Sequence, residues 1–339
     1  MIVRMANEHD IPAIAHFAEL LHGKLNSLPM DKAVIAHKIK RSCVSLTKKI
    51  VSPGSELYFF VLENLATKHV VGCAAIEACV GLTQPFYTYR ISQLEHISPT
   101  LNYRQTVKLL ELNTDLNKTT ELCSLYLLPD YREKNNGKLL SLSRLLFMTN
   151  FPERFTDRVF ADIRGFSIKK HQPSFWQHVI KHFMPFDFAE ADKLTGLEQR
   201  QFISDLMPKF PLYIDLLPTD AQAVIGRPHP KAMPAKKMLE DEGFHSHDYV
   251  NIFDAGPTLT AFRNNIKTIN EVRLVKIKKV DATLNNDMKH YLLATTTLDF
   301  RATVDNAIIE ENEHIIITPR TADALKVGVN DCLLYRTMN

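Results

Sequence analysis

The chain has 339 residues, of which 45% are hydrophobic and 23% charged, with five cysteines and a formal net charge of +3. This composition is that of a globular protein with room for two domains, and a nearly neutral charge without a dense Lys/Arg block argues against nucleic acid as a partner. The sequence shows no signal-peptide pattern, no run of roughly 18 apolar residues and no CxxC pair, so we expect a cytoplasmic protein with reduced thiols, no membrane span and no zinc ribbon.

The predicted elements begin with a strand, a helix and a hairpin. Ile2–Met5 is predicted as a short strand. A helix follows it, because Asp10 suits an N-cap, Pro12 suits a first turn, and apolar residues then recur three and four apart. Leu57–Glu63 and Val70–Cys79 are both strand-like and are separated by a polar turn, which predicts an antiparallel hairpin.

The next four elements alternate between strand and helix. Thr120–Leu128 is an apolar strand that Pro129 stops, and Gly137–Phe147 follows with leucines at helical spacing. Arg158–Arg164 is then predicted as a strand and Ser174–Phe183 as a helix. The predicted order of this half is therefore β-α-β-β-β-α-β-α.

The sequence changes character after Gly256-Pro257. Before that point, Ala235–Phe244 is predicted as a helix ended by Gly243, a favoured C-cap residue, and Tyr249–Phe253 as a strand. After it come short alternating segments, which are Glu271–Lys278, Tyr291–Thr296, Thr303–Ala307, His314–Ile317 and Cys332–Tyr335. We therefore predict a first domain over residues 1–255 and a small β-rich C-terminal region over residues 256–339.

The turn from Arg132 to Gly137 joins a predicted strand to a predicted helix. Turn amides that lead into a helix N-terminus form a concave surface of donors, which suits pyrophosphate oxygens. Asn and Gly, which occupy positions 135 to 137, tolerate positive φ. An ordinary turn that binds nothing fits the same residues, so local chemistry leaves both interpretations open.

The motif Arg132-x-x-Asn135-x-Gly137 after a strand resembles the acyl-CoA loop of GNAT acyltransferases, whose usual pattern is Arg/Gln-x-x-Gly-x-Gly/Ala. Asn135 departs from this pattern by replacing the first glycine, and a left-handed asparagine would keep the shape of the loop. The resemblance implies an α+β fold of the GNAT kind. It has a mixed, mostly antiparallel sheet, flanked by helices and splayed where the acyl-CoA binds, with the β-rich C-terminal region added to it.

Longer blocks resemble the bacterial arginine N-succinyltransferases. They occur in the expected order, as SLP (27–29), CAAIEACVGL (73–82), ELCSLYLLPDYR (121–132), PSFWQ (173–177), LMPKFPLY (206–213), GRPHP (226–230), LEDEGF (239–244) and IFDAGPTL (252–259). The resemblance implies transfer of a succinyl group from succinyl-CoA to the α-amine of L-arginine, the first step of arginine degradation by this route. Succinyl-CoA is then a co-substrate, and neither a permanently bound cofactor nor a metal is implied.

The resemblance also implies roles for single residues. Leu125 would contact succinyl-CoA through its backbone, where N–H groups can polarise a thioester carbonyl, and Arg132, Asn135 and Gly137 would hold the CoA. His229 would be the proton donor, because a histidine titrates near neutrality and can protonate a departing thiolate. Without the resemblance, Leu125 reads as a core leucine and His229 as a loop bystander.

The charges of the substrates call for partners of opposite charge. Glu77, Glu121 and Asp162 are candidates for the guanidinium, and Arg90 and Arg164 for the succinyl carboxylate. Each of them also fits an ordinary ion pair.

Two other functions fit the same sequence. One is transfer of an acyl group to a different amine, such as ornithine, and the other is a non-catalytic GNAT-like partner subunit. We expect small-molecule substrates and a homo- or hetero-oligomer. We also expect direct attack of the amine on the thioester, without an acyl-enzyme.

Overall fold

One continuous 15-stranded sheet runs through the computed structural model, which describes residues 1–21, 27–133, 135–167, 173–197, 199–284 and 289–338. Its first ten strands are β1 (Ile2–Met5), β2 (Leu57–Glu63), β3 (Val70–Glu77), β4 (Thr88–Ser98), β5 (Tyr103–Asn113), β6 (Thr120–Leu127), β7 (Arg158–Asp162), β8 (Leu212–Tyr213), β9 (His245–Val250) and β10 (Pro257–Phe262). They lie in the order β1-β2-β3-β6-β7-β10-β9-β4-β5-β8. Within the described residues only the β6–β7 and β11–β14 pairs are parallel, so the sheet is mixed and mostly antiparallel, as predicted.

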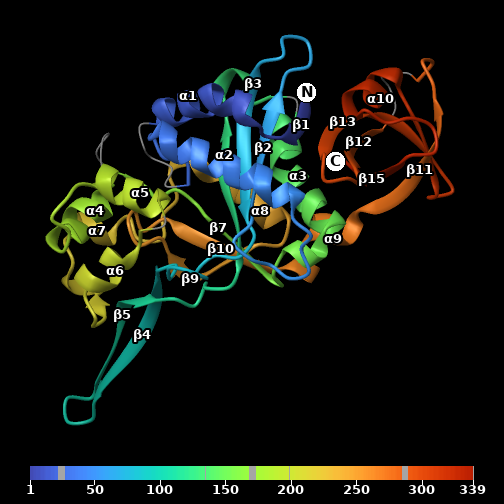
Figure 1. The fold of residues 1–339 in the computed structure, drawn as a ribbon. Helices are drawn as coiled ribbons and strands as arrows, with labels where there is room; N and C mark the ends of the chain where they lie inside the picture. Colours follow the sequence, from blue (N-terminus) through green and yellow to red (C-terminus); the bar gives the residue numbers. More distant parts are fainter. Residues whose placement is uncertain (22–26, 134, 168–172, 198, 285–288, 339) are drawn as a thin grey trace.

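Helices cover both faces of this sheet (Figure 1). The core helices are α1 (Ile11–Leu21), α2 (Lys32–Thr47), α3 (Asn136–Asn150) and α8 (Met233–Asp241). Side chains of a strand alternate between faces. In β2, Phe59 and Val61 therefore pack with α1 and α2, whereas Tyr58 and Phe60 pack with α3. This burial on both faces explains the unbroken apolar run of β2.

A second lobe surrounds the fully buried Trp176. Its short helices are α4 (Ser174–His178), α5 (Phe188–Gly196), α6 (Gln201–Leu206) and α7 (Thr219–Gln222). The hairpin of β4 and β5 projects from the body next to this lobe (Figure 1). None of the helices in the described ranges is long and apolar enough to cross a bilayer.

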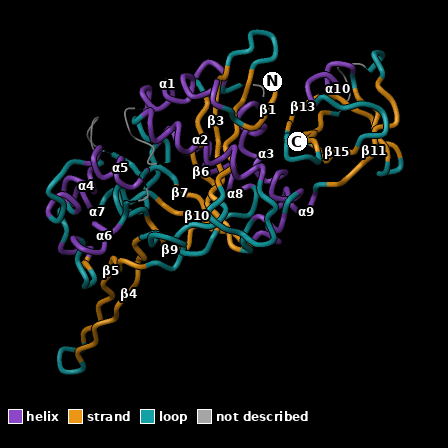
Figure 2. The backbone as a smooth tube through the Cα atoms, viewed as in Figure 1, coloured by secondary structure: helices purple, strands orange, loops and turns teal. Residues whose placement is uncertain are grey.

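The last five strands close into a barrel. They are β11 (Arg273–Val280), β12 (His290–Thr295), β13 (Arg301–Glu310), β14 (His314–Ile317) and β15 (Cys332–Thr337), accompanied by α10 (Pro319–Leu325). Pairing of β12 with both β15 and β13 closes the ring, which Figure 2 shows as a separate group of strands. Short α9 (Lys267–Glu271) precedes the barrel, and the predicted β-rich character of this region is confirmed.

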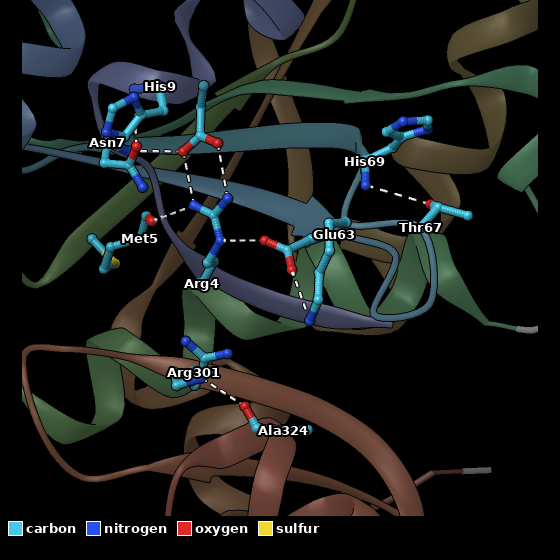
Figure 3. Close-up of polar contacts among 11 residues, drawn as sticks. Arg4, Met5, Asn7, His9, Glu63, Thr67, His69, Arg301 and Ala324 are labelled. Atoms are coloured by element: carbon cyan, nitrogen blue, oxygen red, sulfur yellow. Dashed lines mark hydrogen bonds and ion pairs between the residues drawn. The ribbon is translucent and has the colours of Figure 1, made fainter.

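Strand β1 joins the barrel to the rest of the molecule, because it pairs with β2 on one side and with β13 on the other. Arg4 fixes β1 to the core side of this junction (Figure 3). Its guanidinium donates to both Asp10 carboxylate oxygens at 2.8 Å and to Glu63 Oε2 at 2.7 Å. On the barrel side of the junction, Arg301 Nε donates to the Ala324 carbonyl at 2.6 Å and ties β13 to α10. The barrel is thus a continuation of the core sheet.

Most predicted elements are confirmed, and two are wrong in part. The predicted helix 174–183 ends at His178, because Val179 leaves helical geometry with φ −128°, and a 3₁₀ turn follows. The predicted strand 249–253 stops at Val250, because the Asn251 side chain accepts a hydrogen bond from the Phe253 amide and turns the chain. The division at residues 255 and 256 stays a prediction, and β10, which comes after it, belongs to the core sheet.

Candidate active site

A cavity of about 600 Å³ opens where strands β6 and β7 part. The two strands are parallel and pair only at Thr120 with Val159 and at Glu121 with Phe160. Beyond these pairs the residues of β6 from Leu122 to Leu127 line the cavity. Backbone groups that lose a ladder partner need another one, so a splayed strand offers hydrogen bonds to an extended ligand. The predicted splay of the sheet is therefore present.

A bulge interrupts β6 in the middle of this wall. Tyr126 pairs with Cys73 and Cys123 pairs with Ala75, so two residues of β6, Ser124 and Leu125, stand opposite a single residue of β3. Ser124 has φ +53°. A bulge re-aims the backbone locally, and this one lies where Ser124 and Leu125 line the cavity.

Ser27 holds this bulge in place. The Ser124 amide donates to Ser27 Oγ at 2.9 Å, and the Ser124 hydroxyl donates to the Ser27 carbonyl at 2.8 Å. This pair of bonds stabilises a left-handed serine that would otherwise be strained. Ser27 and Ser124 both lie within the blocks that resemble the family, but a bulge inside an apolar strand leaves no local signal in the sequence.

The loop before α3 forms one end of the cavity. Asn135, its N-cap residue, has φ +64°, the left-handed conformation that keeps the expected loop shape. A Cβ on Gly137 would meet nothing within 4 Å, so this position faces open space. Arg132 Nε donates to the Leu127 carbonyl at 2.9 Å and thereby ties the loop to the end of β6. Leu125, Arg132, Asn135 and Gly137 thus line one cavity, together with the N-terminus of a 15-residue helix.

His229 lies beside this cavity without lining it. Its amide donates to the Arg164 carbonyl at 2.8 Å, and the neighbouring Pro228 forms a bridge with Gly165. Its Nδ1 accepts a hydrogen bond from the Lys231 amide at 3.1 Å. Arg164 and Lys231 both line the cavity, so His229 is fixed at its rim. Because Nδ1 accepts, Nε2 is the ring nitrogen that carries the hydrogen in the neutral imidazole.

Acidic residues gather at the opposite end. Glu77, Glu121 and Asp162 all line the cavity. Arg41 pairs with Glu77, and Thr258 and Asn251 donate to Asp162, whereas the carboxylate of Glu121 has no hydrogen bond or ion pair within the described part of the chain. Among the described residues, Glu121 is thus the one of these three carboxylates without a direct partner, and only the more distant charges of Arg200 and Lys38 favour its ionised form.

The two predicted partners of the succinyl carboxylate are placed differently. Arg164 lines the cavity near His229. Arg90 is 55% exposed on β4, where it lies 4.0 Å from Asp115, and it does not line the cavity. The prediction of Arg90 as a partner of the succinyl carboxylate is therefore not supported by its position.

Burial raises the pKa values of two carboxyl groups at the acidic end of the cavity. Desolvation, with the charges of Asp162 and Glu77 adding to it, raises the pKa of Glu121 to about 8. Desolvation also raises the pKa of Asp162, although its hydrogen bonds from Thr258 and Asn251 act in the opposite direction. Without a ligand the cavity therefore favours a protonated carboxyl at its acidic end, and a bound cation would favour the ionised form.

We expect Glu121→Gln to change how stability depends on pH. The folded-state pKa of Glu121 is about 8 and its ordinary value is 4.5, so between these values the folded protein holds the extra proton and the stability of the wild type falls as pH rises. Glutamine stays neutral and removes this loss. The urea midpoint of the variant should exceed that of the wild type by more at about pH 8.5 than at about pH 5. An equal difference at both pH values would contradict the raised pKa.

Asp254 fixes the strand end that carries Arg164. Its two carboxylate oxygens accept from the Gly165 amide at 2.7 Å and from the Gly256 amide at 2.8 Å. A Cβ on either glycine would collide with a backbone carbonyl, which explains why both positions are glycine. Burial raises the pKa of Asp254 to about 6 despite these two bonds.

Known sequences resemble the chain over almost its full length. Residues 1–268 match the sequence model of a family described as arginine N-succinyltransferase beta subunit, and residues 273–335 match the model of its C-terminal domain. An arginine N-succinyltransferase of Yersinia pestis (strain Pestoides F) is 38% identical over 337 residues, covering 98% of this chain and 96% of that protein. One of Escherichia coli (strain 55989 / EAEC) is 38% identical over 332 residues, with the same coverage.

A solved structure agrees with these sequence matches. Subunit AI of an arginine/ornithine succinyltransferase from Pseudomonas aeruginosa superimposes with a TM-score of 0.89 at 33% identity, covering 99% of this chain and 98% of that one. The agreement includes both the splayed core and the C-terminal barrel, because it extends over the whole chain. By sequence and by fold, the chain belongs to the arginine N-succinyltransferase family of acyltransferases.

Proposed function

We propose that the chain transfers the succinyl group of succinyl-CoA to the α-amine of L-arginine, giving N2-succinyl-L-arginine and CoA. The observation that carries this proposal is the cavity at the β6–β7 splay. It joins a helix N-terminus suited to phosphates at one end to the unpaired Glu121 at the other. Membership of the family supports the same reaction. We further propose that it takes place in the cytoplasm, where unpaired thiols such as the five of this chain persist.

In this proposal the co-substrate lies along β6. Its pyrophosphate meets the amides at the start of α3, near Asn135 and Gly137, and Arg132 supports this loop. The pantetheine arm follows the unpaired backbone of the splayed strand. The thioester carbonyl then reaches the bulge, where a peptide N–H near Leu125 donates to the oxygen as negative charge develops on it.

The acceptor enters from the acidic end of the cavity. Glu121 lies four residues before Leu125, which is about 13 Å along a strand. A long cationic amino acid therefore fits with its guanidinium at Glu121 and its α-amine near the thioester. Guanidinium binding neutralises the half-buried carboxylate, so the substrate relieves the repulsion among the acidic groups.

The chemical step is a direct transfer. The neutral α-amine attacks the thioester carbonyl carbon, so that a C–N bond forms and the carbonyl oxygen becomes an oxyanion. The oxyanion collapses, the C–S bond breaks, and the nitrogen gives up its extra proton to solvent water. His229, as the imidazolium, then donates the Nε2 proton to the departing thiolate and takes a proton back from solvent.

The test is thiol release by the purified chain. Succinyl-CoA and acetyl-CoA serve as donors, and L-arginine and L-ornithine as acceptors, in all four combinations. Release with succinyl-CoA and arginine supports the proposal. Release with ornithine in preference to arginine would identify ornithine as the acceptor and would leave the fold assignment unchanged. CoA binding without release in any combination would exclude catalysis by the isolated chain.

A non-catalytic subunit is the second candidate, because the matching family is described as a beta subunit and the solved relative is named a subunit. Light scattering of the isolated chain, run beside the thiol-release assay, separates the two. An oligomer of this chain alone that turns over substrate would exclude the purely supporting role.

Substitution of Asn135 tests the CoA loop. Asn135→Gly keeps the left-handed backbone and should change the KM for succinyl-CoA little, whereas Asn135→Val forces a β-branched residue into φ +64°. That conformation costs about 1–2 kcal/mol, so the KM for succinyl-CoA should rise roughly tenfold in the valine variant. The KM for arginine, measured at saturating succinyl-CoA, is the internal control. Equal KM values for succinyl-CoA in both variants would show that the loop does not bind CoA.

A further inference from the structure

A buried arginine forms part of the cavity wall without a carboxylate partner. Arg144, in α3, is 1% exposed. Its Nε and Nη2 donate to the Ser141 carbonyl at 3.2 Å and to Ser141 Oγ at 3.0 Å, and its Nη1 lies 3.5 Å from the Cys123 carbonyl. No acidic side chain of the described residues lies within ion-pair distance of it.

This arrangement is costly in the absence of a ligand. A guanidinium carries five N–H donors, and the bonds to Ser141 and Cys123 use only some of them. Burial of a charge without an opposite charge is strongly unfavourable, and desolvation lowers the pKa of Arg144 to about 10. A residue of this kind in a ligand cavity is explained if the ligand brings the missing negative charge.

We propose that Arg144 binds the free carboxylate of the acyl group and so makes the enzyme select a dicarboxylic acyl-CoA over acetyl-CoA. This inference rests on the proposed function. Arg144 contacts the carbonyl of Cys123, the residue immediately before the bulge at which the thioester carbonyl binds. The carboxylate of a succinyl group lies two methylenes beyond that carbonyl and reaches the guanidinium, to which it presents a bidentate pair of oxygens.

The other arginines of the cavity fit this role less well. The charge of Arg164 is already opposed by Asp254, which counteracts the lowering of its pKa by burial. Arg200 lies with its guanidinium 5.3 Å from the centre of the Phe86 ring. Arg132 donates to the Leu127 carbonyl in the CoA loop. Arg144 is therefore the cavity arginine that is both fully buried and without a carboxylate near it.

The test compares donors in the full-length protein with saturating L-arginine. Arg144→Gln should lower kcat/KM for succinyl-CoA by roughly 10²-fold, the size of a lost charge-assisted pair, and change kcat/KM for acetyl-CoA by no more than about threefold. Arg144→Lys keeps the charge without the fork and should recover part of the loss. Arg132→Gln is the matched control, because it weakens the CoA loop and should affect both donors alike.

Three outcomes decide the proposal. A folded Arg144→Gln protein that keeps the donor preference of the wild type would overturn it, and so would an equal loss with both donors. If thermal unfolding shows that the glutamine variant does not fold, the lysine variant decides in the same way, by a loss confined to succinyl-CoA or a loss shared by both donors. A wild-type protein that releases thiol from neither donor would instead contradict the proposed succinyl transfer. Failure of the Arg144 proposal and failure of the proposed function therefore give different results.

Discussion

Replacing His229 by alanine should lower kcat for thiol release by roughly 10²–10⁴, the usual contribution of a general acid. The ring is held at the cavity rim by its Nδ1 bond from the Lys231 amide, and its backbone is fixed to Arg164. Without it, the thiolate must leave unprotonated or take its proton from water. The KM for succinyl-CoA should change little, because His229 does not line the cavity. Steady-state thiol release measures both constants.

Two further variants separate catalysis from folding. Asparagine at position 229 can still accept the Lys231 amide bond and cap the 3₁₀ turn, so His229→Asn should keep the melting temperature and lose as much activity as His229→Ala. His178→Ala, which removes a histidine of α4 outside the cavity, should keep full activity. A wild-type rate of thiol release in His229→Asn would show that His229 is not the general acid.

Replacing Glu242 by alanine should destabilise the protein by about 3 kcal/mol, because it leaves a buried arginine charge with too few partners. Arg336 of β15 donates to Glu242 at 2.7 Å, and both side chains are less than 10% exposed. The second oxygen of Glu242 accepts from the Thr268 amide at 2.7 Å. One carboxylate thus links α8, α9 and the barrel. Urea unfolding monitored by circular dichroism measures the loss.

Glu271 supplies the matched control for this prediction. It also pairs with Arg336, at 3.0 Å, but it is 47% exposed. An exposed ion pair contributes about 0–1 kcal/mol, so Glu271→Ala should shift the unfolding midpoint far less than Glu242→Ala. Equal shifts would show that burial does not set the strength of this pair.

The elements of the core were predictable where one physical pattern dominated. Leu57–Glu63 was predicted with the observed bounds, because a short run rich in aromatic and β-branched residues and followed by a polar turn is typical of a strand covered on both faces. The helix at Lys32–Thr47 and the hairpin of β4 and β5 were missed. The hairpin is mostly exposed, so it lacks the buried stripe that a periodicity argument needs.

The site was predictable where the chemistry was local in the sequence. The motif from Arg132 to Gly137 indicated a left-handed residue at Asn135, and the structure has one. The resemblance, rather than the residues alone, supplied Leu125 and His229. Arg144 was missed because a single arginine in a leucine-rich helix resembles any solvated charge, and only its burial beside Cys123 distinguishes it.

The position of β1 between two distant strands affects the order of folding. The hydroxyl of Thr303 donates to the carbonyl of Met1 across a separation of 302 residues. Contacts of such high sequence separation form late, because the entropy of closing so long a loop must be overcome first. Until the barrel has formed, β1 presents an open edge that carries Ile2 and Val3, two residues fully buried in the native state. Such an edge is a site for intermolecular strand pairing, so refolding yield should fall with protein concentration even where the native state is stable.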